Sequence, residues 1–350
     1  MQFRGQGKPP VGVIFDTDMG NSIDDALALA MLYGFDGKSE VRVVSVSVSK
    51  PNLKAAALCE VIGRFYAGAV SGAFAAFGRT LPVGLATDGK SAEDTPMLTL
   101  PLARRDEKGA PVYSHGIQGL NDTAEVPALI RNAFTAQHDQ NCIAVCVGPA
   151  TNLAKVLTLP GIKDLISKKV KFLSIMGGAF SPGAEPEFNI KTDIAAAKKL
   201  FSEWPTPIVA SGFEVGETLL YPASSIEKDF AWSIAHPVAD AYRAYQQMPY
   251  DTPTWDLTAV LYAVRPEQGY FKLSEPGTIT VLDDGRTQFT PSAGGRHRYL
   301  ILDPVQKERI LNTYIEFASA KPVPRQRFRF QQQQQQQTPP PKPPEAKPPA

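Results

Sequence analysis

Four carboxylates lie close together near the start of the chain, in the segment DTDMGNSIDD. Asp16 and Asp18 follow an apolar run at 11–15, and Asp24 and Asp25 begin a helical pattern. Carboxylates this close repel one another unless a cation or protons offset their charge. An all-oxygen cluster suits a hard cation, Ca²⁺ or Mg²⁺, better than zinc. The segment therefore predicts a cation site, although helix capping accounts for one or two of the acids.

The residues around these acids predict a strand, a tight turn and a helix. The apolar run is short enough to be a buried strand, and apolar residues recur at spacings of three and four from Ile23 to Met31. A strand that enters a helix through a tight turn places its loop at the carboxyl edge of a sheet, where open α/β folds bind ligands. We expect Asp24 and Asp25 in the first turn of the helix.

Strand and helix patterns alternate along most of the chain. Strands are predicted at residues 41–48, 82–86, 141–147, 170–176 and 207–210, with further short strands within 277–302. Helices are predicted at residues 52–67, 124–137 and 192–204, through most of 223–265, and from an Asp303-Pro304 start to about 318. The alternation predicts an α/β fold with an open, mostly parallel twisted sheet, Rossmann-like at its core and flanked by helices.

The composition is typical of a globular protein with a large core. Of 350 residues, 43% are hydrophobic, and the net charge of +1 argues against a nucleic-acid partner. Three cysteines, an odd and sparse set, are expected to be buried free thiols. The chain has no run of the ~18 apolar residues that a membrane span needs. We expect a cytoplasmic protein with no membrane partner, and an export signal removed before residue 1 is the alternative.

Two segments depart from this pattern. Residues 87–123 are rich in Gly, Pro, Ser and charge, which favours a lid or an active-site loop. From residue 321 the chain becomes rich in Gln and Pro and cannot build a core. We therefore predict one domain over residues 1–320 and a disordered tail over 321–350.

Three later places put polar groups where elements begin or end. Val147 ends an apolar strand, Glu187 and Asn189 follow a Gly-rich loop, and Trp255 and Asp256 begin a helical pattern. Each is weak when taken alone. Val147 is then a core residue, Glu187 and Asn189 are ordinary loop residues, and Asp256 is a helix cap.

Taken together and in order, these motifs resemble the nucleoside hydrolase family, of the inosine–uridine-preferring type, over about residues 11–320. The family's D-x-D-x-G-x-D-D stands here as DTDMGNSIDD, with two more residues between Gly20 and Asp24. MGGA at 176–179 and HGIQGL at 115–120 also match. The resemblance implies the nucleoside hydrolase fold, a dimer or tetramer of identical chains, and a small-molecule nucleoside or riboside as substrate.

The resemblance also implies a Ca²⁺ ion and a catalytic base. Asp18 would bind the ion and take a proton from the attacking water. Asp25 would bind the ion with both oxygens, Asp256 would supply another carboxylate, and Val147 would offer its backbone carbonyl. The implied reaction is hydrolysis of the N-glycosidic bond of a ribonucleoside or related riboside.

Three further residues are implied to hold the sugar: Asp24, Glu187 and Asn189. Breaking an N-glycosidic bond builds positive charge on the ribose ring, in an oxocarbenium-like transition state that carboxylates stabilise. A cation lowers the pKa of water and binds vicinal hydroxyls, and a neighbouring carboxylate takes the proton. The residue types therefore match the implied chemistry.

The chain departs from the family at several positions. Trp255 stands where the best-known members have a His, a candidate acid for the leaving base, so activation of the leaving group must differ, for example by stacking. The family's G-N before E-F-N is missing from SPGAEP at 181–186. Lys50 aligns with a family Asn and either contacts the substrate or is a solvated strand-end lysine, with Asn52 as a possible substitute. Because of these departures, the sequence does not predict which aglycone the substrate carries.

Two other functions compete with this interpretation. VIFDTDMG resembles the D-x-D motif of haloacid-dehalogenase-type phosphohydrolases, and VLDDG at 281–285 mimics their late acidic pair. That motif requires Thr or Val where this chain has Gly20, and it leaves Asp24 and Asp25 unexplained. The second is a Ca²⁺-dependent nucleoside or sugar binder without turnover. Phosphatase assays with Mg²⁺ test the first alternative, and release of ribose from nucleosides with Ca²⁺ present tests the second.

Overall fold

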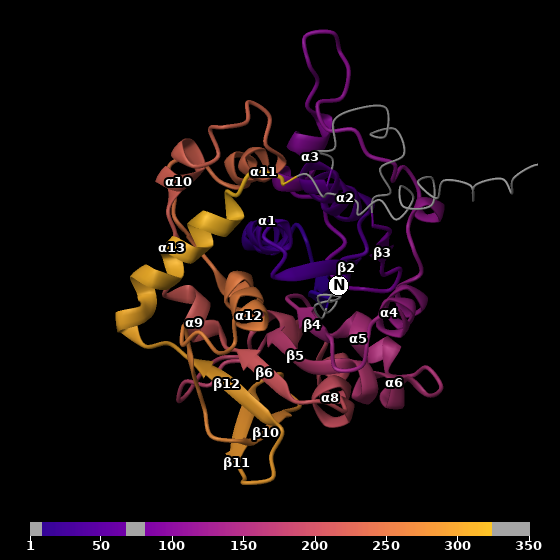
Figure 1. Ribbon diagram of the computed structural model, residues 1–350, viewed down its shortest axis with the longest axis vertical. Coiled ribbons are helices and arrows are strands. Elements are labelled where there is room, and N and C mark those ends of the chain that lie inside the picture. Colours follow the sequence, from indigo (N-terminus) through magenta and orange to yellow (C-terminus); the bar gives the residue numbers. More distant parts are fainter. Residues whose placement is uncertain (1–8, 68–80, 324–350) are drawn as a thin grey trace, which may run out of the picture.

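One large sheet passes through the molecule with helices on both faces (Figure 1). The computed structural model describes residues 9–67 and 81–323. Its strands, in the order β11-β10-β12-β6-β5-β4-β1-β2-β3 with β9 beside β12, are β1 (Val11–Thr17), β2 (Val41–Val48), β3 (Val83–Leu85), β4 (Cys142–Cys146), β5 (Val170–Met176), β6 (Ile208–Ser211), β9 (Lys272–Leu273), β10 (Gly277–Val281), β11 (Thr287–Pro291) and β12 (His297–Ile301). β7 (Leu220–Tyr221) and β8 (Thr252–Pro253) pair separately.

The sheet is parallel from β3 to β12, and β10 and β11 add antiparallel strands at one edge. The order 3-2-1-4-5-6 of the first six strands is that of a Rossmann-type sheet. The chain runs outward from β1 to β3 and then returns to place β4 on the other side of β1. The carboxyl ends of β1 and β4 therefore flank the switch point, where such sheets bind ligands. The predicted mostly parallel α/β fold is confirmed.

Two hydrophobic cores lie on the two faces of the sheet. The helices are α1 (Asp24–Gly37), α2 (Leu53–Ala67), α3 (Pro96–Ala103), α4 (Val126–Thr135), α5 (Thr151–Val156), α6 (Ile162–Lys169), α7 (Phe188–Thr192), α8 (Ile194–Glu203), α9 (Phe213–Glu217), α10 (Ala223–Lys228), α11 (Pro237–Tyr245), α12 (Trp255–Val264) and α13 (Lys307–Ala318), with short 3₁₀ turns η2 (Leu120–Asp122) and η3 (Pro304–Gln306). α1, α2, α12 and α13 pack on one face, and α4, α5, α6 and α8 on the other. Phe15 and Ile14, adjacent in β1, point into opposite cores, as strand alternation requires.

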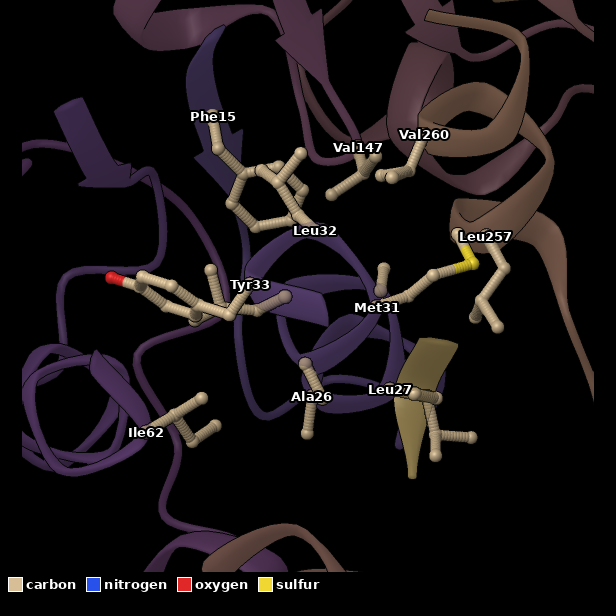
Figure 2. Close-up of a cluster of buried hydrophobic side chains, with 14 of the residues drawn as sticks. Phe15, Ala26, Leu27, Met31, Leu32, Tyr33, Ile62, Val147, Leu257 and Val260 are labelled. Carbon is tan, nitrogen blue, oxygen red and sulfur yellow. The ribbon is translucent and has the colours of Figure 1, made fainter. Parts of the chain in front are cut away.

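α1 is buried all round, from Asp24 to Asp36. Figure 2 shows Leu32 of this helix against Phe15 of β1, with Val260 of α12 and Val147 near by. A helix enclosed in this way cannot shift without disturbing the core. The two acids at its start are therefore held on a rigid element.

Most predicted elements are present, with small shifts at their ends, and the differences have local causes. The stretch 87–123 is not one loop, because α3 begins within it at Pro96, a favoured first helical residue. Asp303 caps as predicted, accepting from Val305 N at 3.1 Å, but the first turn is the 3₁₀ turn η3. α6 was not predicted. The predicted tail lies, from residue 324 on, outside the described residues. Within residues 9–67 and 81–323, none of the helices has the length and apolar character of a membrane span.

Packing of α1 against α13 generates a test of the scaffold. A Cβ at Gly34 would lie 2.1 Å from the backbone oxygen of Phe317. We expect Gly34→Ala to lower the free energy of unfolding by about 1–3 kcal/mol through overpacking. At Gly37, on the same helix, a Cβ meets only the Val323 side chain at 3.4 Å. Urea unfolding should show a change of less than ~1 kcal/mol for Gly37→Ala, and equal losses in the two variants would contradict this packing.

Candidate active site

A pocket of about 230 Å³ opens at the switch point of the sheet. It lies where β1, β4 and β5 end and α7 and α12 begin. The lining residues are Asp18, Asn21, Ser22, Val147, Met176, Glu187, Phe188, Asn189, Phe213, Trp255 and Asp256. The structure thus brings together six predicted site residues from four separate parts of the chain, while Asp24 and Asp25 lie behind the lining.

The two acids of α1 are buried behind the pocket and differ in their contacts. Asp24 Oδ1 accepts from the Ser22 hydroxyl, and its Oδ2 accepts from the backbone N of Asp256 at 3.0 Å. This bond joins the start of α1 to the start of α12. Asp25 Oδ1 accepts from the Thr17 hydroxyl, whereas its buried Oδ2 has no hydrogen-bond partner among the described residues. Asp25 therefore keeps one oxygen available for a ligand.

Glu187 and Asn189 belong to the start of α7, which the sequence analysis did not predict. Glu187 caps this helix: its Oε1 accepts from the backbone N of Asn189 at 2.8 Å, and its Oε2 from Gly178 N and Ile190 N at 3.1 Å. Asn189 Nδ2 donates to the backbone oxygen of Val147 at 3.1 Å. The carbonyl that the resemblance assigns to the cation therefore already accepts a hydrogen bond from another lining residue.

Burial dominates the electrostatics of the site. It raises the pKa of Asp18 and of Asp24 to about 6 and the pKa of Glu187 to about 7. For Asp25 and Asp256, burial followed by repulsion from neighbouring carboxylates raises the pKa well above its usual value. The repulsion shows that acids from β1, α1 and α12 share one electrostatic environment, in which negative charge is costly without a compensating cation.

Within residues 9–67 and 81–323, no group of three His, Cys, Asp or Glu side chains forms a ready metal site. Three features nevertheless fit a divalent cation. Asp25 Oδ2 is buried without a partner, the surrounding carboxylates repel one another, and the available ligands are all oxygens. This set of donors matches the preference of Ca²⁺ or Mg²⁺.

Lys50 and Asn52 are engaged with other groups and do not line the pocket. Lys50 Nζ donates to Asn21 Oδ1 at 2.8 Å and to the backbone oxygen of Ser91. Asn52 Nδ2 donates to Ala92 O and to Asp94 Oδ1, both at 2.9 Å. A direct role for Lys50 or Asn52 in substrate binding stays a prediction.

Trp255 forms one wall of the pocket together with Phe213 and Phe188. Its ring stacks on Phe213 with centroids 5.5 Å apart and an angle of 23°, and its Nε1 donates to the Phe213 backbone oxygen at 3.1 Å. Phe188 is 52% exposed at the pocket mouth. The wall offers flat apolar surface, and the Trp255 N–H is already used.

Sequence analysis missed Asn21, and it grouped Asp16 with the other acids although Asp16 does not line the pocket. Asn21 donates from Nδ2 to Asp18 Oδ2 at 2.6 Å, and the two extra residues of the first loop were the available signal. Asp16 is fully buried beneath the loop and accepts from Ser47 and Asn152. Burial raises the pKa of Asp16 to about 7. No sequence pattern shows that Asp16 lies beneath the loop while Asp18 lines the pocket.

The fold and pocket define an open α/β protein with an acidic site at its switch point. The profile of the family described as inosine-uridine preferring nucleoside hydrolase matches residues 13–312, so the chain belongs to this family. It is accordingly an N-ribosyl hydrolase that acts on nucleosides. A comparison with curated proteins found no match.

Solved structures of nucleoside hydrolases share the fold. A plant nucleoside hydrolase is 21% identical with a TM-score of 0.64, and the match covers 89% of this chain and 100% of that one. A purine-preferring ribonucleoside hydrolase from Gardnerella vaginalis is 19% identical, with a TM-score of 0.63 and coverage of 88% and 98%. The inosine-uridine preferring nucleoside hydrolase from Bacillus anthracis is also 19% identical, with a TM-score of 0.60 and coverage of 88% and 99%.

The buried carboxylates predict an unusual pH dependence of stability. Asp16 and Glu187 have folded pKa values of about 7, above their unfolded values, so the folded state binds protons more tightly. With chelator present, lowering the pH from 7.5 to 6.0 should raise the free energy of unfolding by about 1 kcal/mol for each group. His236, whose pKa burial lowers to about 3, opposes this by roughly 1 kcal/mol at most.

Urea unfolding with EDTA at the two pH values measures this change. Asp16→Asn should lose about 1 kcal/mol of the gain on acidification, because it removes one of the buried carboxyls whose folded pKa is raised. A wild-type protein that is less stable at pH 6.0 than at pH 7.5 would contradict the burial of ionisable groups at this site.

Proposed function

We propose that this chain hydrolyses the N-glycosidic bond of a ribonucleoside or related riboside with the help of Ca²⁺. The single observation that supports this most is the meeting of Asp18, Glu187 and Asp256 in one pocket, backed by the unpartnered oxygen of Asp25. A pocket of acids and amides with one aromatic wall suits a polyhydroxylated sugar that carries a flat ring.

Asp18, Asp25, Asp256 and the Val147 carbonyl would hold the ion. A bound cation of this kind lowers the pKa of water and orients neighbouring hydroxyl groups. Asp18 is the proposed general base, because it lies at the end of β1 and lines the pocket.

Asp24, Glu187 and Asn189 are the proposed partners of the ribose hydroxyls. The backbone bonds of Glu187 and the contacts of Asp24 with Ser22 and Asp256 hold both carboxylates in place. Negative charge held beside the sugar stabilises the oxocarbenium-like transition state without reorganisation. The volume of about 230 Å³ is below the ~300–1,000 Å³ of pockets that enclose whole drug-sized ligands. We place the sugar inside and the base against Trp255.

Replacing Asp18 tests the proposed base. Asp18→Asn should lower kcat by about 10²- to 10⁴-fold, the usual contribution of general base catalysis, while the circular dichroism spectrum stays unchanged. Release of ribose from a panel of nucleosides with Ca²⁺ present is the measurement. An unchanged rate in this variant would refute the role of Asp18.

A matched control separates the rival phosphohydrolase function. Asp283→Asn alters a fully exposed side chain in the VLDDG turn, which pairs only with Lys198 in the described structure. It should leave ribose release unchanged, whereas a phosphohydrolase would depend on this acidic pair and would cleave phosphate esters. Tight nucleoside binding without ribose release in the wild-type protein would favour the binder without turnover.

The aromatic wall predicts a dependence on the leaving group. Trp255 donates its N–H to Phe213, and neither Phe213 nor Phe188 can give a proton to a departing base. A riboside whose leaving group needs no proton, such as p-nitrophenyl riboside, should therefore react at least ~100-fold faster in kcat/KM than inosine or uridine. Trp255→Ala should raise KM for the nucleosides by about 3- to 10-fold through lost stacking. Equal kcat/KM values for all substrates would reveal an acid that this proposal omits.

A further inference from the structure

Two departures from the family pattern lie side by side in the structure. The longer first loop supplies Asn21, and Lys50 replaces an expected Asn at the end of β2. Lys50 Nζ donates to Asn21 Oδ1 at 2.8 Å, and Asn21 Nδ2 donates to Asp18 Oδ2 at 2.6 Å. The extra residue and the substituted residue thus form one hydrogen-bonded chain that ends on the proposed base.

We propose that Lys50 and Asn21 are positioning residues, which form a relay that orients the Asp18 carboxylate for catalysis. The inference rests on the proposed function, because it assumes that Asp18 takes the proton. The relay engages Oδ2 of Asp18 and thereby fixes the orientation of the carboxylate beside the pocket. In this proposal Asn21, which the longer loop supplies, orients Asp18 only when Lys50 is present to hold the Asn21 side chain.

The chemistry of the relay fixes its direction. An ammonium group only donates hydrogen bonds, so Asn21 must turn its Oδ1 toward Lys50. The amide nitrogen then faces Asp18, where a donor to a carboxylate is favourable and an acceptor would repel. Without Lys50, the amide of Asn21 could rotate and present its oxygen to Asp18. Lys50 therefore acts on the base through Asn21.

The position of Lys50 is itself enforced by burial. Its side chain is 1% exposed, and a buried ammonium is costly unless acceptors surround it. Besides Asn21, the Ser91 carbonyl accepts from Nζ, and a Glu93 carboxylate oxygen lies 3.9 Å away. Two hydrogen bonds and this ion pair engage the ammonium, and the pocket lining does not include Lys50.

The segment 89–95, which follows β3, contacts the loops that carry Asn21 and Lys50. Thr95 Oγ1 donates to the backbone oxygen of Gly20 at 3.0 Å, next to Asn21 in the first loop. Gly89 packs so closely that a Cβ there would lie 1.8 Å from the Ser49 oxygen. This part of the stretch expected to be a lid or active-site loop is bonded to the first loop and holds Lys50 in place.

A double-mutant cycle tests the relay. Asn21→Ala and Lys50→Met should each lower kcat for ribose release by about 10- to 100-fold, as expected for loss of one charge-assisted hydrogen bond, with KM changed less than about threefold. The double variant should be no more than about twofold slower than the slower single variant, because both changes break one chain. Lys54→Met, which removes an exposed partner of Asp94, is the matched control and should retain full activity.

Asn21→Asp separates orientation from space filling. It keeps the size of Asn21 but places an acceptor against Asp18, so kcat should fall at least as far as in Asn21→Ala. It also decides the matter if Lys50→Met fails to fold. Thermal melting shows whether each variant is folded.

Three results would overturn the relay: wild-type kcat in Asn21→Asp, additive losses in the cycle, or a raised KM with unchanged kcat in Lys50→Met. The last would show that Lys50 contacts the substrate directly. Absence of ribose release from the wild-type protein would instead reject the proposed function, and the relay with it.

Discussion

The structure depends on confining several carboxylates in a space that water barely reaches. Asp24 and Asp25 are fully buried, and Asp18 and Asp256 are nearly so. Each charge loses solvation and feels its neighbours, so the site is unfavourable unless protons, donors or a cation compensate. The donors that the chain supplies reach some oxygens and leave Asp25 Oδ2 without a partner. The surrounding fold must therefore stabilise the protein enough to offset the desolvation and repulsion of these carboxylates.

The fold places the acids on elements that cannot move apart. α1 is enclosed between the sheet, α2, α12 and α13, and the bond from Asp256 N to Asp24 ties it to α12. The parallel pairing of β1 with β4 keeps the end of one strand beside the end of the other. Acids fixed on such elements cannot relieve their repulsion by moving apart, so protons or a cation must offset it.

The pocket has two chemically different sides. Carboxylates and amides after β1 and at the starts of α7 and α12 line one side, while Trp255 and Phe213 present flat rings on the other. In the proposed function the acidic side would stabilise positive charge and supply a base. The aromatic side offers contact area, and its Trp255 N–H is already donated to the Phe213 backbone oxygen.

The sequence by itself determined the parts that are local along the chain. Helical spacing from Ile23, the strand–helix alternation and the positions of Asp18 and Asp25 depend on near neighbours. Only the tertiary structure decided that Lys50 faces Asn21, because those residues lie 29 positions apart and meet through the pairing of β1 with β2. The same holds for the bond from Asp256 to Asp24 across 232 positions, since the packing of α12 against α1 exists only once the sheet has formed.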